Sequence, residues 1–420
     1  MGHKMRRFLF VLPCFIPDTS GYAHAFAGFI ESLRARSHDS IDILTLKHDD
    51  GTAEKENILG CTVYRLRLRS IKLQAIVTEI QLWKKIMALQ ATQFYDFIVF
   101  ETADYPFAAY LAARKFGKRM MVRIHGCAET EWTIYRNEWE FRWRRYWSRR
   151  MYDKTTNICA TSTYYLDYVQ NYFLFGNPLK ISTKNYFILP NIAFTGTGDK
   201  PENMPCIPEH IKSLISNEHI TFLTLGRLDV YGEIQKNIKR LLLALSALKR
   251  MHYFPRVRLL CVGNGNLLPY LKQLAIESGV QSNIIFTGPL SHAAVTFLEH
   301  HCAAVILPST FEGQSMFALE SLSAGAPLLL SRVGGLTNMV NPEINGLLFD
   351  PLNIDSIANA INQYIIGMHG NHEAVRKQSL IHHNKYFKPD SIIDCFIQTV
   401  EMIESDINAS FELLSGSRAN

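Results

Sequence analysis

The feature that most constrains the fold is an alternation of short apolar runs with longer amphipathic stretches, which occurs twice along the chain. The runs have the length of β-strands and are apolar at almost every position, as in 97–100 and 304–307. Such runs suit parallel strands that are covered on both faces of a sheet. The stretches between them, such as 23–37 and 107–117, have the spacing of amphipathic helices. The chain therefore predicts an α/β protein with two doubly wound, Rossmann-like domains.

The predicted strands form two series. In the first half they lie at 6–14, 40–46, 62–68, 96–102, 119–126, 157–162 and 185–191. In the second half they lie at 220–227, 256–263, 283–288, 303–309, 326–331 and 345–350. Ligands of such sheets bind beyond the carboxyl ends of the strands, so we expect the active site in a cleft between the domains.

A segment rich in glycine, proline and charge, 195–210, separates the two series and reads as a linker. We therefore predict an N-terminal domain over 1–195, a linker over 196–218 and a C-terminal domain over 219–385. Residues 386–420 are expected to form a terminal helix.

Composition narrows the class of protein. The 420 residues are 47% hydrophobic and 20% charged, which is ordinary for a soluble globular protein. A net charge of +6 suits anionic substrates or a membrane surface, but it is too small to argue for a nucleic-acid partner. No stretch reaches the roughly 20 apolar residues that cross a bilayer. The basic and then apolar segment 1–15 could be a signal peptide, but its apolar run has strand length, so a first β-strand is preferred.

Eight cysteines are scattered along the chain without any CxxC pair. Several of them, such as Cys159 and Cys261, lie inside apolar runs. This usage indicates reduced, buried thiols in a cytosolic protein.

Two cations of the second half lie near a strand end. Arg227 follows the strand at 220–227 directly after Gly226, and Lys236 is expected at a helix start. An arginine and a lysine that face one cleft would neutralise a diphosphate, and the arginine could bind it in a bidentate way. Taken alone, the two are better read as solvated surface cations.

Glycine turns at other strand ends are weaker signals. The strand, turn and helix at 262–271 lack the third glycine of a dinucleotide fingerprint, and no P-loop sequence is present. Gly288 and Pro289 end another strand, where backbone groups could hold a planar base.

Two carboxylates flank a predicted helix start. Glu312 lies in a loop, Gly313 allows close approach of the backbone, and the helix is expected to begin near Gln314. The N–H groups at such a helix start can bind phosphate oxygens. Glu320, expected about two turns into an apolar helix, needs a partner, for which the hydroxyls of a ribose are suitable. The alternative is that the helix dipole and a structural arginine satisfy the two carboxylates.

Together these segments resemble a known family. The E-x7-E spacing of Glu312 and Glu320, the upstream segment 226–237 and the segment 333–351 are similar to the retaining GT-B glycosyltransferases of family 4, "glycosyl transferases group 1". The resemblance is strong over 219–365 and looser in the N-terminal half. It implies that the N-terminal domain lies on the acceptor side and that the C-terminal domain binds a nucleotide-sugar donor. It also implies that the terminal helix returns to the first domain.

The resemblance assigns roles residue by residue. Arg227 and Lys236 would hold the donor diphosphate and stabilise it as the leaving group. Glu320 would bind the ribose hydroxyls and Glu312 the hydroxyls of the donor hexose. The remaining donor-binding positions would act through the backbone: Gly288, Gly313, Gln314, Ser315 and Met316.

In the first half, the resemblance places Gly21 at the closest approach of a glycine-rich loop, and His125 in a frequent "HG" pair, as a contact of the donor sugar. A buried structural histidine is the competing reading of His125. The chain departs from the family pattern at Ser20, where a glycine is common, and at Asn338, where a glutamate is common.

The implied reaction needs neither a metal nor a cofactor. No DxD pair follows an apolar strand, and Arg227 and Lys236 can stabilise the negative charge that develops on the leaving group. Retention without an obvious nucleophile suggests front-face substitution, in which the leaving phosphate helps to take the acceptor's proton. A UDP-sugar is favoured over a GDP-sugar, although contacts to the base are largely made by the backbone in such folds.

A segment on the acceptor side, 131–154, is rich in tryptophan and arginine. Trp139, Trp143 and Trp147 recur at i, i+4 and i+8, which places them on one stripe of a helix. The segment is either an interfacial helix that meets anionic lipid headgroups, or a helix with a core-packed tryptophan stripe and a solvated basic face. Four C-terminal histidines have no consistent ligand spacing and no metal is expected there: His369, His372, His382 and His383.

The sequence thus predicts a glycosyltransferase that moves a hexose from a nucleotide diphosphate sugar to a glycan or lipid-linked glycan, in the synthesis of cell-surface polysaccharide. The alternatives are a non-catalytic sugar-nucleotide-binding partner subunit and a GT-B phosphorylase or epimerase. The expected location is the cytoplasm, with a peripheral place on the inner face of the cytoplasmic membrane if 131–154 is interfacial. No nucleic-acid partner is expected.

Overall fold

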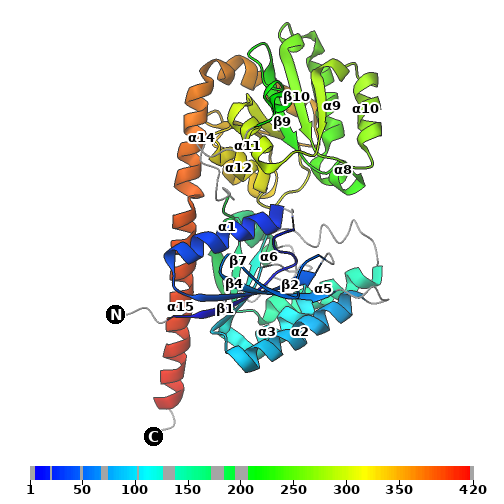
Figure 1. Ribbon diagram of the computed structural model, residues 1–420. Helices are drawn as coiled ribbons and strands as arrows, with labels where there is room; N and C mark the ends of the chain where they lie inside the picture. Colours follow the sequence, from blue (N-terminus) through cyan, green and yellow to red (C-terminus); the bar gives the residue numbers. More distant parts are fainter. Residues whose placement is uncertain are drawn as a thin grey trace. The chain divides into compact units, whose positions relative to one another are not determined.

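The computed structural model describes residues 5–18, 21–47, 51–67, 74–101, 104–125, 138–171, 184–193 and 207–416. These residues form two compact units, which are described separately below. Unit 1 contains residues 1–192 and 389–420, and unit 2 contains residues 193–388. Each unit is built on its own sheet (Figure 1). Two parallel α/β domains confirm the predicted fold class.

Unit 1 is built on an eight-stranded sheet with the order β3-β4-β2-β1-β5-β6-β7-β8. Its strands are β1 Arg7–Val11, β2 Ser40–Lys47, β3 Lys55–Ile58, β4 Cys61–Arg67, β5 Phe97–Phe100, β6 Met120–Ile124, β7 Asn157–Ala160 and β8 Asn185–Ile188. All neighbouring strands pair in parallel except β3, which runs antiparallel to β4 at the sheet edge. The sequence predicted the seven parallel strands and missed the half-exposed β3.

The helices of unit 1 cover both faces of this sheet (Figure 1). They are α1 Gly21–Arg36, α2 Gln74–Gln93, α3 Pro106–Phe116, α5 Glu138–Lys154, α6 Thr163–Asn171 and α15 Pro389–Gly416. The alternation of side chains along β1 shows how the two faces are filled. Phe8 and Phe10 pack with Phe29 of α1 and Phe396 of α15. Leu9 and Val11 point to the other face, into a core that residues of α2, α3 and α5 complete.

The first turn of α3 is capped by a side chain from another helix. Pro106 occupies its first position, and the Oε2 atom of Glu79 in α2 accepts hydrogen bonds from the backbone N–H groups of Phe107 (2.5 Å) and Ala108 (2.9 Å). The first N–H groups of a helix have no partner within it, so the carboxyl group of α2 satisfies them. Burial raises the pKa of Glu79 to about 7.

The long helix α15 belongs to unit 1 although it follows unit 2 in the sequence. Besides Phe396, it contributes Glu404, which lies 3.7 Å from Arg6, and Asp394, which pairs with Arg36 at 2.6 Å. The core of unit 1 is therefore completed by the last segment of the chain.

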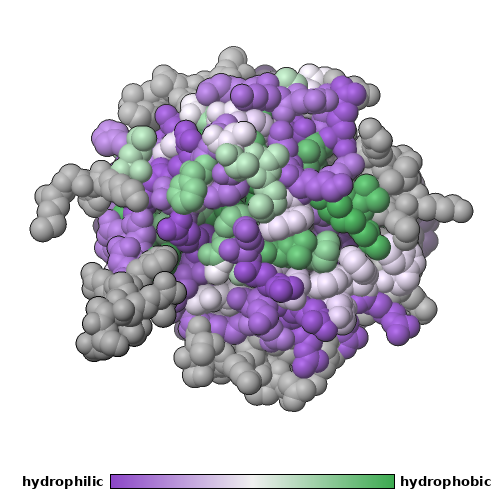
Figure 2. Space-filling view, turned by 90° about the horizontal axis from the view of Figure 1, so that it is seen from below, coloured by the Kyte–Doolittle hydropathy of each residue, from purple (hydrophilic) through white to green (hydrophobic). Residues whose placement is uncertain are grey.

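The face of unit 1 that carries α2 and α3 has both hydrophobic and hydrophilic residues on its surface. Figure 2 shows hydrophobic residues gathered near its middle, with hydrophilic residues around and between them. Large exposed hydrophobic side chains here include Ile80 of α2, which is 37% exposed, and Phe94, which follows α2 and is 59% exposed. They alternate with solvated positions along α2, so this face needs no partner to explain it.

Unit 2 is built on a six-stranded, wholly parallel sheet with the order β11-β10-β9-β12-β13-β14. Its strands are β9 Ile220–Leu225, β10 Val257–Val262, β11 Ile284–Gly288, β12 Ala304–Leu307, β13 Leu328–Ser331 and β14 Gly346–Phe349. All six coincide with predicted strands. The order reverses between β9 and β12, and ligands of such sheets bind at this point, beyond the carboxyl ends of the strands.

Helices cover both faces of this second sheet (Figure 1). They are α7 Glu209–Lys212, α8 Val230–Lys236, α9 Ile238–Ala247, α10 Leu268–Glu277, α11 His292–His301, α12 Met316–Ser323, α13 Ile354–Gln363 and α14 His372–Tyr386. Phe222 belongs to the core under α9, α10 and α13, and its neighbour Leu223 belongs to the core under α11 and α12. A six-residue 3₁₀ helix, Gly334–Met339, follows β13.

Candidate functional site

The carboxyl ends of β9 and β12 bring together two of the predicted site residues of unit 2. The Nζ atom of Lys236 lies 2.9 Å from the Oε2 atom of Glu312, and the side-chain amide of Gln235 donates to the same oxygen at 3.3 Å. The Lys236 side chain is 15% exposed and that of Glu312 is 10% exposed. The pair is therefore mostly shielded from water and would need to open, or accept a third partner, when an anion binds.

The position of Lys236 differs from the prediction. It is the last residue of α8 and not the start of a helix. Asn237 follows it in the left-handed conformation and separates α8 from α9, while its side-chain amide donates to the backbone oxygens of Pro308 and Pro351. These buried hydrogen bonds fix the junction at which Lys236 lies.

Arg227 follows β9 but is held by another carboxylate. Its Nε and Nη2 atoms donate to Oδ2 of Asp229 at 2.9 and 2.5 Å, and its guanidinium lies 5.3 Å from the centroid of the Tyr231 ring. The other oxygen of Asp229 accepts from the N–H of Gly232 and caps α8. At 63% exposure the Arg227 side chain remains accessible to a ligand. Asp229 was not among the predicted site residues, although its position just before a helix is typical of a cap.

The helix that follows Glu312 begins slightly later than predicted. Ser315 is the N-cap of α12, its hydroxyl accepting from the N–H of Ala318, and the helix starts at Met316 instead of Gln314. Gln314 and Ser315 are buried. Glu320 lies in the second turn, not two turns in, and it is half-buried.

Near Glu320 lies a carboxyl group that was not among the predicted site residues. Glu299 of α11 is 1% exposed, and its Oε1 atom lies 2.9 Å from the hydroxyl of Ser321. That hydroxyl also lies 2.6 Å from the backbone oxygen of Phe317. Burial, reinforced by the nearby charge of Glu320, raises the pKa of Glu299 well above its ordinary value. Burial thus favours the uncharged form of the Glu299 carboxyl group beside Glu320.

Glycines let the loops at this edge of the sheet pack closely against one another. Gly263 follows β10 with φ of +134°, and a Cβ atom there would lie 1.9 Å from the backbone oxygen of Gly226. Gly334 has φ of +51°, and a Cβ atom there would lie 1.9 Å from the backbone oxygen of Glu312. Gly288 ends β11 and its carbonyl accepts from the N–H of Gly263. These backbone contacts place the loop of Glu312 against Gly334.

The corresponding edge of unit 1 carries a buried ionic network at its own strand-order reversal, between β1 and β5. Glu101 follows β5, Arg123 lies in β6 and His125 follows β6. The Oε2 atom of Glu101 accepts from Nη1 of Arg123 at 3.0 Å and lies 2.7 Å from Nε2 of His125. Arg123 also donates to the backbone oxygens of Leu189 and Pro190.

The network sets the charge of its members. Burial alone would raise the pKa of Glu101, but Arg123 and the hydrogen bond to His125 hold it below its ordinary value. Burial and the neighbouring Arg123 lower the pKa of His125. Glu101 is therefore ionised and His125 is neutral near pH 7. Gly21, the other predicted residue in this unit, begins α1, and the hydroxyl of the adjacent Tyr22 donates to the backbone oxygen of Glu101 at 2.7 Å.

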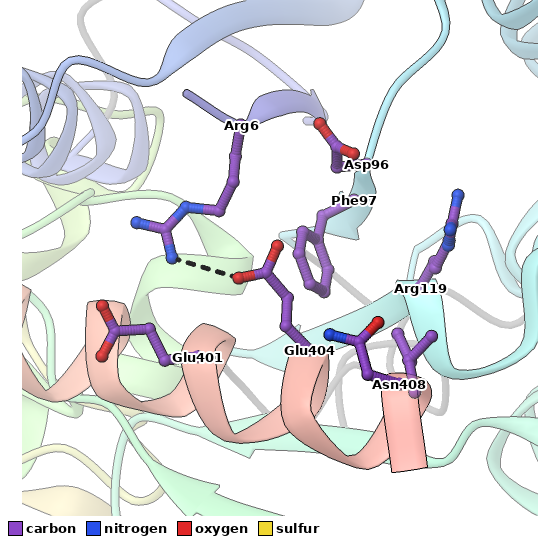
Figure 3. Close-up of a pocket in the computed structure, with 8 residues that line it drawn as sticks. Arg6, Asp96, Phe97, Arg119, Glu401, Glu404 and Asn408 are labelled. Carbon is purple, nitrogen blue, oxygen red and sulfur yellow. Dashed lines mark ion pairs between the residues drawn. The ribbon is translucent and has the colours of Figure 1, made fainter. Parts of the chain in front are cut away.

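A pocket of about 290 Å³ lies elsewhere in unit 1, at the amino ends of the strands. Figure 3 shows Arg6, Asp96 and Phe97 on one side and Glu401, Glu404 and Asn408 of α15 on the other. Because the predicted site residues of unit 1 lie at the carboxyl ends of the strands, this pocket is not part of the candidate site.

The aromatic helix α5 is partly core and partly surface. Trp143 and Trp147 pack on Phe107 of α3, and Trp147 also lies 5.2 Å from the ring of Tyr110. Trp139, in contrast, is 40% exposed. The stripe is therefore not a continuous exposed surface. The predicted segment 131–137 lies outside the described residues.

The described residues also bear on metal binding, membrane spanning and the state of the cysteines. Within the residues that the structure describes, no group of three or more histidine, cysteine, aspartate or glutamate side chains could hold a metal ion. Over the same residues, no helix combines the length and the apolar character needed to cross a membrane. Six cysteines in the described part of the chain are free thiols: Cys14, Cys61, Cys159, Cys261, Cys302 and Cys395.

Comparison with known proteins follows the division into two units. Residues 207–377 match the family described as glycosyl transferases group 1, and residues 20–181 match the glycosyl transferase 4-like domain. The chain is 29% identical over 189 residues to the lipopolysaccharide 1,6-galactosyltransferase of Escherichia coli strain K12, which covers 44% of this chain and 49% of the relative. The stretches that match curated relatives span about a third to a half of those proteins' own length.

Solved structures share the fold over nearly the whole chain. A sucrose-phosphate synthase from Thermosynechococcus elongatus superposes with a TM-score of 0.77 at 16% identity, covering 96% of this chain and 100% of the other. The Anabaena protein HepE, in complex with UDP, superposes with a TM-score of 0.67 at 14% identity, covering 94% and 100%. With two parallel α/β domains and a family match in each half, the chain belongs to the GT-B glycosyltransferases of family 4.

Proposed function

We propose that this glycosyltransferase moves a hexose from a nucleotide diphosphate sugar, a UDP-sugar rather than a GDP-sugar, to a glycan or lipid-linked glycan in the synthesis of cell-surface polysaccharide. The observation that carries the proposal is the shielded pair of Lys236 and Glu312 at the strand-order reversal of unit 2. A lysine held by a carboxylate at such an edge is poised to exchange it for a diphosphate. The UDP complex of the structurally similar HepE supports the choice of nucleotide.

In the proposed complex, Lys236 and Arg227 neutralise the diphosphate and stabilise the charge of the leaving group. Glu312, released from Lys236, accepts hydrogen bonds from hydroxyls of the hexose, and Glu320 accepts them from the ribose. The two cations supply the charge stabilisation for which other transferases use a metal ion, so we propose a metal-independent reaction.

Backbone groups complete the donor site in this proposal. Gly313 allows close approach, and the N–H groups of Gln314, Ser315 and Met316 face the phosphates or the sugar at the start of α12. Gly288 lies beside the base. In unit 1, His125 contacts the sugar, and Gly21 begins the helix nearest to it.

The family resemblance supports retention of the anomeric configuration, and no side chain is assigned as a nucleophile. We propose front-face substitution, in which the departing phosphate oxygen helps to remove the acceptor's proton. Product analysis by proton NMR with a competent acceptor tests this directly. An inverted anomeric centre in the first product formed would refute retention.

Thermal unfolding with UDP, GDP and ADP tests the donor site. A ligand at 100 times its Kd raises stability by about 2.7 kcal/mol, so a large melting shift is expected with UDP. Lys236→Ala should abolish the shift, whereas Lys272→Ala, which removes an exposed lysine on α10, should preserve it. An unchanged shift in Lys236→Ala would show that the diphosphate binds elsewhere.

Activity assays with the same protein distinguish the alternative functions. A partner subunit that only binds the donor would show the UDP shift but neither transfer nor hydrolysis of any UDP-hexose. A phosphorylase would release sugar phosphate from a glycan when inorganic phosphate is added, and an epimerase would convert a nucleotide sugar without an acceptor. The presence of Lys236, Arg227, Glu312 and Glu320 in the same chain favours the transferase over these alternatives.

We also propose that the outer face of α5 rests on an anionic membrane surface, and that the protein lies in the cytoplasm. Arg142, Arg149 and Arg150 are exposed on this helix together with Trp139 and Tyr146. Exposed arginines beside tryptophan and tyrosine suit the headgroup region of a bilayer. A solvated basic face is the alternative reading. The free thiols support a reducing compartment.

Co-sedimentation with vesicles tests the membrane proposal. Binding to vesicles with 30% phosphatidylglycerol should exceed binding to pure phosphatidylcholine by about 10-fold or more, since each arginine near the surface contributes about 1 kcal/mol. The double variant Arg142→Glu/Arg149→Glu should lose this difference. Equal binding to both vesicle types by the wild-type protein would contradict the proposal.

A further inference from the structure

The buried network of unit 1 fixes more than the charge of His125. An ionised carboxylate can only accept hydrogen bonds, and the Oε2 atom of Glu101 lies 2.7 Å from the Nε2 atom of the imidazole. Nε2 must therefore carry the hydrogen of this contact. A neutral imidazole has a single N–H, so its Nδ1 atom bears a lone pair and acts as an acceptor.

Surrounding groups hold this arrangement from several elements. Arg123 in β6 donates to the same carboxylate oxygen and keeps it ionised. Tyr22 of α1 lies with its ring edge-on to the imidazole at 5.1 Å between centroids. Asn191, beyond β8, lies close enough to the imidazole to favour its protonated form. The imidazole is thus oriented by the carboxylate of Glu101 and by the edge-on ring of Tyr22.

Two buried acceptors at this edge have no hydrogen-bond partner within the described part of the chain. They are the Nδ1 atom of His125 and the Oε1 atom of Glu101. Buried polar atoms are rarely left without a partner in folded proteins, and those that are often serve a ligand. The missing partner must be a donor, because both atoms can only accept. Sugar hydroxyls are such donors.

We propose that Glu101 is a positioning residue that locks His125 as the Nε2–H tautomer, so that Nδ1 accepts a hydrogen bond from a hydroxyl of the bound sugar. The inference rests on the proposed function, in which His125 contacts the donor sugar. It adds the direction of the hydrogen bond and the residue that determines it. The arrangement resembles other sites in which a carboxylate fixes the tautomer of a working histidine.

Tautomer and activity can be measured separately. In protein labelled with ¹⁵N-histidine, long-range proton–nitrogen NMR spectra at pH 7.5 should show a protonated Nε2 and an unprotonated Nδ1 for His125. His125→Gln assigns the signal. This measurement needs no substrate, so it tests the tautomer even if no UDP-sugar is a substrate. A protonated Nδ1 at this pH would overturn the proposal.

A pair of His125 variants tests the direction of the hydrogen bond. The amide of asparagine reaches the position of Nδ1 and can supply an acceptor there, whereas that of glutamine reaches the position of Nε2 and can only replace the donor. We expect kcat/KM with the UDP-sugar to fall by about 10-fold in His125→Asn and by about 100-fold in His125→Gln, since a hydrogen bond that is lost from a buried group costs about 1–3 kcal/mol. Equal losses, or a smaller loss in His125→Gln, would overturn the proposal.

Glu101→Gln tests the positioning role through the pH profile. The carboxylate raises the pKa of His125 against the effects of burial and Arg123, so its removal should move the acid limb of kcat/KM to lower pH. It should also lower kcat/KM at pH 7.5, because both tautomers become populated. A variant that folds, as judged by circular dichroism, but retains the wild-type limb and tautomer would overturn the role of Glu101. If this variant does not fold, the wild-type NMR spectrum and the two His125 variants still test the tautomer and the direction of the hydrogen bond.

Failure of the proposed function has a different signature. If UDP gives no thermal shift and no UDP-hexose is consumed, the donor proposal is wrong, whatever the tautomer. If UDP binds and transfer occurs but the tautomer or the order of the His125 variants is not as expected, only the positioning role is wrong.

Discussion

The carboxyl edges of the two sheets differ in how their charged residues are buried and paired. In unit 1, Glu101 and Arg123 are buried against each other, and backbone oxygens take up the remaining donors of the arginine. In unit 2, Arg227 is exposed and paired with Asp229, and Lys236 forms a mostly shielded pair with Glu312. The first arrangement fixes side chains, and the second holds the cations in ion pairs that the proposed function requires to open when a diphosphate binds. One fold can therefore supply a rigid edge and an adaptable edge from similar strands.

The buried pair of unit 1 gives the largest expected effect. Arg123→Met leaves the ionised Glu101 without its main partner at a site with no exposure to water. Breaking a buried ion pair costs about 3–5 kcal/mol in the free energy of unfolding. Urea denaturation measures it. If the loss were below about 1 kcal/mol, the two edges would not differ in the way described.

The glycine-lined edge of unit 2 gives the next effect. Gly334→Ala places a Cβ atom against the backbone oxygen of Glu312 in a left-handed conformation, which should cost about 3 kcal/mol. Gly288→Ala is the matched control, because its φ is +74° but no atom lies within 4 Å of the added Cβ. It should cost only about 1–2 kcal/mol. Equal losses in urea denaturation would show that backbone strain, and not the close packing of the loop, determines the cost.

Each unit also contains a buried carboxyl group with a raised pKa: Glu79 in unit 1, at about 7, and Glu299 in unit 2. Such a group holds a proton in the folded state that the unfolded chain releases. Stability therefore falls as pH rises from about 4.3, the pKa of an unfolded glutamate, to the folded pKa, by at most about 1.4 kcal/mol per pH unit.

Two conservative variants separate the contributions of these groups to the pH dependence. Glu79→Gln should remove the part of the slope that ends near pH 7, and Glu299→Gln should remove a part that continues above it. Denaturation series from pH 5 to pH 9 provide the measurement. If Glu299→Gln showed the same slope as the wild type above pH 7, Glu299 would be ionised and would repel Glu320.

The smallest effect is expected where α15 meets the surface of α1. The Arg36 side chain is 38% exposed and that of its partner Asp394 is 45% exposed. Pairs of this kind contribute less than about 1 kcal/mol and are screened by salt. Arg36→Ala should lower stability by no more than that, and 1 M NaCl should reduce the difference. A larger loss would mean that surface charge has a greater part in joining α15 to unit 1 than the aromatic contacts of Phe396.

The sequence predicts most of the architecture because apolar runs identify strands that are buried on both faces. It fails at β3, which is a short antiparallel edge strand with alternating exposure, and therefore carries no continuous apolar signal. It also misplaces Lys236, because a seven-residue helix between Arg227 and the longer α9 leaves only a weak pattern. Tertiary contacts, not local propensity, fix both elements.

Candidate site residues are accessible to sequence reasoning when they follow strands, as Arg227, Glu312 and His125 do. Glu101 carried the same signal, a carboxylate directly after a buried run, but its importance depends on contacts with β6 that no local pattern encodes. Glu299 lies in the middle of a helix and becomes notable only because Ser321 and Glu320 of the next helix face it. The order in which residues meet across a sheet or between helices is the information that the linear pattern lacks.

The late position of Phe396 has a consequence for synthesis of the protein. Phe8, Phe10 and Phe29 are made within the first 30 residues, but the aromatic side chain that covers them follows roughly 200 residues of unit 2. Phe396 follows Phe29 by 367 residues, so at translation rates of about 5–20 residues per second this surface waits about 20–70 s for its cover. During that interval these phenylalanine side chains are exposed to chaperones and to other polypeptides. Unit 1 is synthesised first, but its core can be completed only after unit 2 has been made.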